Sequence, residues 1–201
     1  MSLRQSYRFI APVYDLIVDR PTAAARARSL QRLNDLAPAE ILIEGIGTGL
    51  DIPHLPAQHR YTGTDITPAM LERANARASG TKYEVELLLA DSMRLPFDDD
   101  RFDHVVMHLI LAVVPDPGLA LQEASRVLRP GGSIFVLDKF LRPGQRAPLR
   151  RALNTITRHI ATRTDVVLET LLEDTPELAK THDVSALAGG WFRLIELHKT
   201  R

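Results

Sequence analysis

The six residues EGIGTG, 44–49, constrain the fold of this chain more than any other segment, because they close the apolar run EILIE, 40–44. That run predicts a buried strand. Glycines at 45, 47 and 49 allow a tight turn and a close approach of a ligand to the backbone. A short helix near 51–58 would then turn its N-terminus toward polar or negative ligand groups. A glycine-rich turn with a purely structural role remains the alternative.

The rest of the chain alternates strand-like and helix-like runs, which predicts βαβ units and a mostly parallel, Rossmann-like α/β sheet. Further strands are expected to end at Ile66 and to cover 83–90, 102–109 and 133–140. The end of the chain, around Gly189-Gly190, is typical of an antiparallel hairpin. Near the N-terminus, helices are expected over 3–19, with an interruption at Pro12, and over 22–36, with Thr22 as N-cap. A third helix is expected after the N-cap Thr67, running to about Ser79, and a fourth over 117–128, stopped by Pro130-Gly131-Gly132. The last helical segments are expected over 145–174, with a break near Thr164.

The spacing of the glycines limits which classes of ligand the turn could bind. A dinucleotide fingerprint, GxGxxG, would need glycine at position 50, where this chain has Leu50. The third glycine is instead Gly49, and the sequence contains no GK[ST] motif of a phosphate-binding loop. The pattern therefore disfavours both NAD binding and nucleoside triphosphate hydrolysis.

Two aspartates follow strands in positions suited to a nucleoside. Asp65 lies at the end of the second expected strand, where a carboxylate can accept bonds from both ribose hydroxyls. Asp91 ends the third strand and could accept the exocyclic amine of adenine, with Ile66 and Met93 as apolar faces for the ring. The alternatives are a helix-capping aspartate at 65 and core packing for the apolar pair.

Composition sets the class of protein. A length of 201 residues with 45% hydrophobic and 25% charged residues fits one soluble domain. The absence of cysteine excludes disulfides and thiolate chemistry, and the histidines show no paired metal-ligand spacing, so no metal is expected. With no long apolar run and no signal-like N-terminus, we expect a cytoplasmic protein.

An ordered series of motifs resembles the class I S-adenosylmethionine-dependent methyltransferases. The series is EGIGTG, TGTDITPAML, ADSMRLPF, FDHVVMHLILAVVPDP and EASRVLRPGGSIFVLDKF, and the resemblance covers about residues 7–140. Within that family, YRFIAPVYD and HLILAVVPDP are similar to soluble bacterial phosphatidylethanolamine N-methyltransferases and to ubiquinone and menaquinone C-methyltransferases. The resemblance implies a mostly parallel seven-stranded sheet with a C-terminal antiparallel hairpin and helices on both faces. It also implies one domain over 1–201, with an N-terminal arm or lid over 1–36 and a helical insertion over 141–174.

The resemblance also implies roles for individual residues. S-adenosylmethionine would be the methyl donor and S-adenosylhomocysteine the product. The residues implied to contact this cofactor are Glu44, Gly45, Gly47, Gly49, Asp65, Ile66, Asp91, Ser92, Met93, Met107 and His108. Tyr14 would lie in the N-terminal arm that covers the cofactor and would be a catalytic residue.

Methyl transfer from a sulfonium needs alignment and exclusion of water more than a catalytic triad. A protonated amine cannot attack, so His108 is a candidate to accept or relay the proton of an amine substrate. The competing interpretation is that His108 only packs or positions the substrate.

Charge is segregated along a chain whose net charge is zero. Arginines gather in residues 1–32 and 141–164, both of which the fold would place over the ligand edge of the sheet. In the second segment Leu149, Leu153, Ile156 and Ile160 recur at helical spacing beside Arg146, Arg150, Arg151, Arg158 and Arg163. This amphipathic basic helix could lie on an anionic membrane, whereas packing on the protein's own core is the alternative.

These features predict a methyltransferase for an amphipathic acceptor, with the amine of phosphatidylethanolamine first. A quinone-ring or other small-molecule C- or O-methyltransferase is the second hypothesis, and a noncatalytic sensor of the cofactor is the third. Nucleic acid is disfavoured as a partner, because the asparagine-proline-proline-aromatic motif of DNA amine methylases is absent after the fourth strand and aromatic residues make up 5%.

Overall fold

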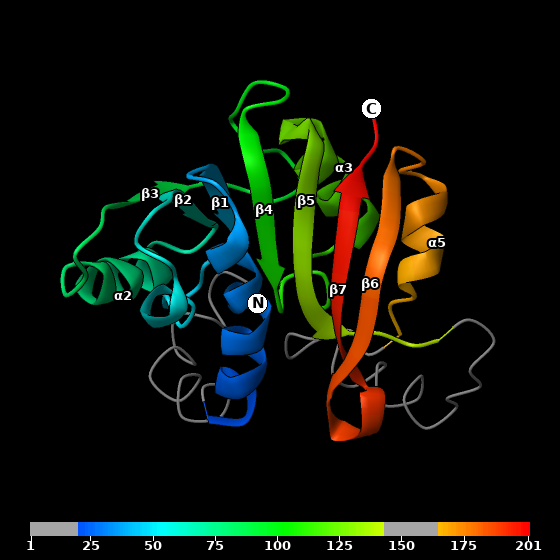
Figure 1. Cartoon of the computed structure of the whole chain (residues 1–201), viewed down its shortest axis with the longest axis horizontal. Helices are drawn as coiled ribbons and strands as arrows, with labels where there is room; N and C mark the ends of the chain where they lie inside the picture. The colour runs from blue at the N-terminus through cyan, green and yellow to red at the C-terminus, as the bar shows by residue number, and fades with distance from the viewer. Residues whose placement is uncertain (1–19, 143–164) are drawn as a thin grey trace.

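The computed structural model describes residues 20–142 and 165–201, which are organised by one seven-stranded sheet (Figure 1). The strands are β1 (Glu40–Glu44), β2 (Arg60–Asp65), β3 (Val85–Leu89), β4 (Phe102–His108), β5 (Leu128–Lys139), β6 (Leu178–Leu187) and β7 (Phe192–Lys199). Their order across the sheet is β3-β2-β1-β4-β5-β7-β6. The first five strands pair in parallel, and β7 pairs antiparallel with both β5 and β6. The predicted parallel sheet with a C-terminal antiparallel hairpin is therefore confirmed.

Helices cover both faces of this sheet, because successive side chains of a strand point to opposite sides. On one face Ile43 and Val106 share a core with Leu30, from a helix over residues 20–30, and with α2 (Pro68–Ala78). On the other face Leu42 and Val105 share a core with α3 (Pro117–Val127) and α5 (Leu168–Glu173). Three short 3₁₀ segments complete the described elements: η1 (Gln31–Asp35), η2 (Ile52–His54) and η3 (Ala188–Gly190).

The first helix differs from its predicted form. Arg20 and Pro21 are already helical, so Thr22 is not the N-cap. Its hydroxyl instead accepts a hydrogen bond of 3.0 Å from Nε of Arg26, one turn later. The helix changes to 3₁₀ geometry at Gln31, so the predicted helix 22–36 is two segments.

Two other boundaries also differ. The predicted helix over 51–58 is only the single 3₁₀ turn η2, because Pro56 has no backbone N–H to continue it. α3 ends at Val127 and β5 starts at Leu128, so the Pro130-Gly131-Gly132 stretch belongs to an irregular start of the strand, where the register with β4 shifts. The N-terminal segment 3–19 and residues 143–164 of the predicted insertion lie outside the described residues.

The topology places a site at one edge of the sheet. β1 lies between β2 and β4, so the connections after these strands diverge from the middle of the sheet, and ligands bind at such a point. In Figure 1 this is the lower edge, toward which β4 points and beside which the helix 20–30 lies. None of the described helices is long and apolar enough to cross a membrane.

Candidate active site

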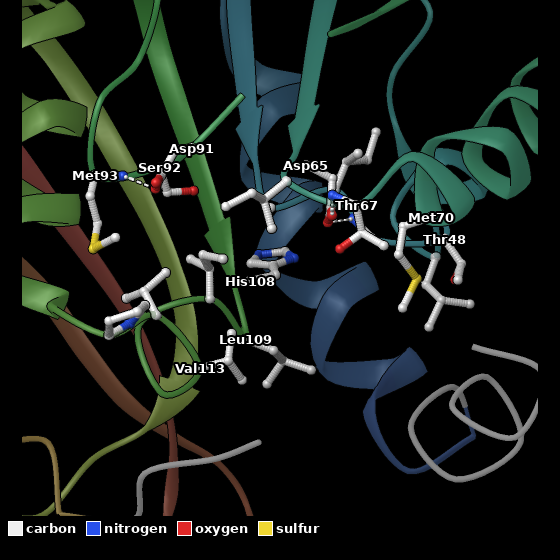
Figure 2. A pocket seen from close by; sticks show the side chains of 18 of the residues that line it. Thr48, Asp65, Thr67, Met70, Asp91, Ser92, Met93, His108, Leu109 and Val113 are labelled. Atoms are coloured by element: carbon white, nitrogen blue, oxygen red, sulfur yellow. Dashed lines mark hydrogen bonds between the residues drawn. The ribbon is translucent and has the colours of Figure 1, made fainter. Parts of the chain in front are cut away.

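A cavity of about 340 Å³ opens at the carboxyl ends of β1, β2 and β4. Figure 2 shows Asp65 and Thr67 on one side of it, Asp91 and Ser92 on the other, and His108 between them. The described residues that line it are Arg26, Gly45, Ile46, Gly47, Thr48, Leu50, Asp65, Ile66, Thr67, Met70, Asp91, Ser92, Met93, His108, Leu109, Ile110, Val113, Val114 and Pro115. Segments far apart in sequence therefore converge on one mostly apolar hollow, as ligand sites do.

The glycine-rich turn forms the floor of this cavity. Gly45, Gly47 and Gly49 have φ values of 68°, 57° and 81°, which side chains rarely adopt. A Cβ at position 45 would lie 2.5 Å from Cδ1 of Ile110, in the loop after β4. The turn is therefore closely packed against that loop, and its backbone is open to a ligand at Gly47.

Asp65 connects the end of β2 to the glycine turn. Its Oδ2 accepts a hydrogen bond of 3.1 Å from the Gly47 amide, and its Oδ1 accepts one of 2.8 Å from the Thr67 amide. Thr67 occupies the N-cap position of α2, but its side chain makes no capping bond. Burial raises the pKa of the Asp65 carboxyl, and these backbone hydrogen bonds oppose that rise. The carboxylate lines the cavity while being held from behind, which suits a group that accepts hydroxyl donors.

Asp91 and its neighbours form the opposite wall. Asp91 Oδ1 accepts a hydrogen bond of 2.9 Å from the Met93 amide, which fixes the turn after β3. Ser92 and Met93 line the same wall, and Ile66 lines the cavity from the end of β2. The four residues predicted to contact a nucleobase thus share one cavity.

Glu44 and Met107 lie apart from the other predicted residues. Glu44 is completely buried at the end of β1, and neither carboxylate oxygen has a hydrogen-bond partner within the described residues. Burial raises its pKa well above the usual range. Met107 is completely buried in the core shared with α3, on the face of β4 opposite His108. Neither residue lines the cavity, and nor does the predicted Gly49, so any effect of the three on a ligand would pass through neighbouring residues.

His108, at the end of β4, is held through both ring nitrogens. Its Nδ1 lies 2.9 Å from Oδ1 of Asp51, and its Nε2 lies 2.9 Å from the hydroxyl of Ser29 in the helix 20–30. The ring lines the cavity, yet its two polar atoms are engaged elsewhere. Proton transfer by His108 would need one of these hydrogen bonds to break, so the role of base stays a prediction.

The loop after β4 supplies a continuous apolar wall. Leu109 has a φ of 59°, which is strained for a residue with a branched side chain, and its amide donates to the Leu137 carbonyl at 2.8 Å. Such strain persists only where the surrounding structure imposes it. The apolar residues of this loop that line the cavity are Leu109, Ile110, Val113, Val114 and Pro115.

Asp138 anchors that loop from β5. Its Oδ2 accepts a hydrogen bond of 3.1 Å from the Ala112 amide, and its Oδ1 accepts one of 2.7 Å from the Lys139 amide. The residue is completely buried, and burial raises its pKa to about 6 despite these bonds. The position of the apolar wall therefore depends on a carboxyl that does not itself line the cavity.

Sequence reasoning missed several residues of the site. Arg26, Asp51 and Ser29 form a buried cluster with His108, although they lie in three separate segments. Only the position of Asp51, an acid just after the glycine turn, could have indicated it. Tyr14 lies outside the described residues. Within those residues no group of three histidine, cysteine or acidic side chains could hold a metal ion.

Comparison with known proteins places this geometry in a family. Residues 42–136 match the model of a methyltransferase domain. The chain is 28% identical to a phosphatidylethanolamine N-methyltransferase of Cereibacter sphaeroides, over 98% of each protein. It is 37% identical to a demethylmenaquinone methyltransferase of Thermus thermophilus over 64% of this chain and 62% of that protein. The crystal structure of an S-adenosylmethionine-dependent methyltransferase of Thermotoga maritima, described as a possible histamine N-methyltransferase, superposes with a TM-score of 0.71 at 20% identity, over all of both chains.

The residues present fit S-adenosylmethionine, which supplies an activated methyl group when bound. Two carboxylates at opposite walls match its ribose and adenine donors, and the open glycine backbone at Gly47 matches close approach by its amino-acid end. Asp65, Asp91 and the turn 45–49 would hold the cofactor, and a methyl acceptor is the second substrate. The matched domain and the relatives support an S-adenosylmethionine-dependent methyltransferase, and the fold is that of the class I enzymes.

Proposed function

We propose that this enzyme methylates the amine of an amphipathic acceptor, with phosphatidylethanolamine as the first candidate. The observation that carries the proposal is the apolar wall formed by Leu109, Ile110, Val113, Val114 and Pro115. The acidic residues that line the cavity, Asp65 and Asp91, are those assigned to the nucleoside. A free polyamine or an amino sugar would need further acids, whereas a headgroup attached to hydrocarbon matches an apolar wall.

The similarity over nearly the whole length to a phosphatidylethanolamine N-methyltransferase supports the same acceptor. The higher identity to a demethylmenaquinone methyltransferase, over about two thirds of the chain, favours a prenylated quinone as the second candidate. Both acceptors carry hydrocarbon, so the wall alone does not separate them. They differ in the atom methylated, and the product therefore decides between them.

The proposal is tested by transfer of labelled methyl from S-adenosylmethionine to matched acceptors. Micelles of phosphatidylethanolamine, a demethylated menaquinone and histamine would be compared, with products separated by chromatography. We expect methylated phosphatidylethanolamine as the main product. Main transfer to the quinone would replace the first candidate by the second, and transfer to histamine alone would refute an amphipathic acceptor.

A charge placed in the wall gives an independent test. Val113→Asp should lower kcat/KM for the lipid by at least about tenfold, because a carboxylate in an apolar site is costly to desolvate. Leu119→Asp is the matched control, since Leu119 is 46% exposed and lies outside the cavity lining. Binding of S-adenosylhomocysteine should stay within twofold in both variants. Equal activities of the two variants would argue against the wall as the acceptor site.

We also propose that the arginine-rich segments 1–36 and 141–174 cover this site and that the second contacts an anionic membrane. Most of both segments lies outside the described residues, so the proposal rests on the sequence pattern. Each arginine near an anionic bilayer contributes about 1 kcal/mol of attraction. Vesicle sedimentation would compare the wild type with a variant in which Arg146, Arg150, Arg151 and Arg158 are replaced by glutamine. Equal sedimentation of both proteins would contradict membrane contact.

A further inference from the structure

A buried polar cluster joins the helix 20–30 to the floor of the cavity. Asp51 Oδ1 lies 2.9 Å from Nη1 of Arg26 and 2.9 Å from Nδ1 of His108. His108 Nε2 lies 2.9 Å from Oγ of Ser29, one helical turn after Arg26. All four residues are exposed by 5% or less. The helix is thus attached to the ends of β1 and β4 at two points.

The geometry of this cluster favours an ionised Asp51. Burial opposes ionisation of Asp51, but the neighbouring His108 and Arg26 hold its pKa well below the usual range. Asp51 is therefore a carboxylate that pairs with the guanidinium of Arg26. Buried ion pairs are kept only where further hydrogen bonds satisfy the partners, and His108 supplies one of these to Asp51.

Arg26 has donor capacity beyond these contacts. Its Nε donates to the Thr22 hydroxyl at 3.0 Å and its Nη1 donates to Asp51, whereas its Nη2 makes no hydrogen bond with any described residue. Arginine carries five N–H donors in a planar fork. The side chain lines the cavity, and it is the one lysine or arginine among the described residues that do so.

The cofactor's own charges complement this arrangement. S-adenosylmethionine carries one anion, the carboxylate of its methionine portion, and two cations, the sulfonium and the ammonium. Asp65 and Asp91 offer the cavity only negative charge. A cation beside the glycine turn would stabilise a carboxylate bound there, and Arg26 lines the same cavity as Gly45 and Gly47.

We propose that Arg26 binds the carboxylate of the cofactor, and that Asp51 and His108 are positioning residues that hold Arg26 and its helix at the cavity wall. His108 then acts through its two hydrogen bonds and not as a base. The inference rests on the cofactor alone and is independent of the acceptor.

The first test compares two ligands by calorimetry: S-adenosylhomocysteine and its decarboxylated analogue, 5′-S-(3-aminopropyl)-5′-thioadenosine. We expect the wild type to prefer S-adenosylhomocysteine by about 10- to 100-fold, the range of a charge-assisted hydrogen bond. Arg26→Met should abolish this preference by weakening only S-adenosylhomocysteine, and Arg26→Lys should restore part of it. A wild type that binds both ligands equally, or an Arg26→Met variant that keeps the preference, would overturn the proposal.

The second test addresses positioning. His108→Ala should reduce the preference for the carboxylate, and His108→Asn should retain part of it, because asparagine can still donate to Asp51 near the Nδ1 position. His182→Ala, on the exposed strand β6, is the control and should change nothing. If circular dichroism shows that His108→Ala is unfolded, Ser29→Ala replaces it, because this substitution removes only one hydroxyl. Ser29→Ala should also reduce the preference for S-adenosylhomocysteine. If the folded variants lost affinity equally for both ligands, or lost no affinity at all, the positioning role would be refuted.

Discussion

Two buried carboxyl groups, one before and one after the glycine turn, have pKa values shifted in opposite directions. At Glu44, burial outweighs the opposing effect of the nearby Ser92 side chain and raises the pKa of the carboxyl well above the usual range. Asp51 is as deeply buried, yet Arg26 and His108 hold its pKa well below the usual range. The partners available to each group, and not burial alone, decide whether the charge is kept.

This contrast predicts opposite pH dependences of stability. A carboxyl whose pKa is raised by folding stabilises below its unfolded pKa, about 4.3 for glutamate, and loses that contribution as the pH rises toward the folded value. Glu44→Gln should therefore raise the free energy of unfolding by about 1–3 kcal/mol at pH 8 and have little effect near pH 4. Urea unfolding of the ligand-free protein from pH 4 to pH 8 measures this difference.

Asp51→Asn is the matched comparison. In the wild type, folding lowers the pKa of Asp51. The carboxylate therefore contributes to stability above its unfolded pKa of about 3.9, and this contribution is lost as the pH falls through the folded pKa. The variant should lose about 3–5 kcal/mol at pH 7, because Arg26 is left buried without a charged partner. If Glu44→Gln destabilised the protein at pH 8 in the same way, a neutral Glu44 would be excluded.

The carboxylate of Asp65 lines the cavity and also accepts two backbone hydrogen bonds that hold the local structure. Asp65→Ala should weaken S-adenosylhomocysteine binding by about 10- to 100-fold, because each charge-assisted ribose hydrogen bond contributes about 1.5–3 kcal/mol. Asp65→Asn keeps one oxygen acceptor for the Gly47 or Thr67 amide and should bind with intermediate affinity. Calorimetry on variants with unchanged circular dichroism measures both. Unchanged affinity in folded Asp65→Ala would contradict the ribose assignment.

At the scale of elements, the glycine turn depends on two different constraints. Gly47 needs its positive φ of 57°, but a Cβ there would meet nothing nearer than 3.9 Å. Gly49 has a φ of 81°, and a Cβ there would also lie 2.7 Å from Cδ1 of Ile52 and 3.0 Å from Cα of Ala74 in α2. The first position is constrained by backbone conformation alone, and the second by conformation and packing.

The two alanine variants should therefore differ. Gly47→Ala should cost about 1–2 kcal/mol of stability, the penalty of a left-handed backbone for a residue with a Cβ. Gly49→Ala should cost more, by about a further 1–3 kcal/mol, because α2 must shift or Ile52 must leave its packing. Chemical unfolding of both proteins measures the difference. Equal stabilities would mean that α2 moves without cost.

The strands could be predicted from the sequence because each apolar run is short and is followed by a turn. The fourth expected strand differs from β4 by a single residue, and the final hairpin has the predicted glycines in its turn. The helical ends could not be predicted as well. Residues 51–58 form only a short 3₁₀ turn because Pro56 ends it, and the start of β5 depends on pairing with β4, which is a contact between distant segments.

In the candidate site, too, only the residues marked by a local sequence pattern could be predicted. Asp65, Asp91 and the glycines could be predicted because they lie at or shortly after strand ends at the same edge of the sheet. The cluster of Arg26, Asp51 and His108 could not, since its hydrogen bonds join residues 25 and 57 positions apart. Local patterns carry no information on which side chains of a helix meet a strand end in the folded chain.

For the molecule as a whole, ligand binding is coupled to folding. The cavity is formed by β1, β2, β4, the loops after them and the helix 20–30, so only the folded chain presents all its walls. A ligand that binds the folded state alone stabilises it by mass action, by about 2.7 kcal/mol at a concentration 100 times its dissociation constant. The choice of ligand can therefore be measured through the stability of the entire protein.

We expect S-adenosylmethionine and S-adenosylhomocysteine to raise the Tm and NAD to leave it unchanged. For a chain of about 200 residues, each kcal/mol shifts the Tm by about 2–4 °C, so a saturating ligand should raise it by about 5–10 °C. The dinucleotide fingerprint needs a third glycine at position 50, for close packing of the helix on the strand, whereas Leu50 is buried there and lines the cavity. Adenosine is the control for binding of the nucleoside part alone and should give a smaller shift. A shift with NAD and none with S-adenosylhomocysteine would contradict the cofactor assignment, because the same stability measurement reports both ligands under identical conditions.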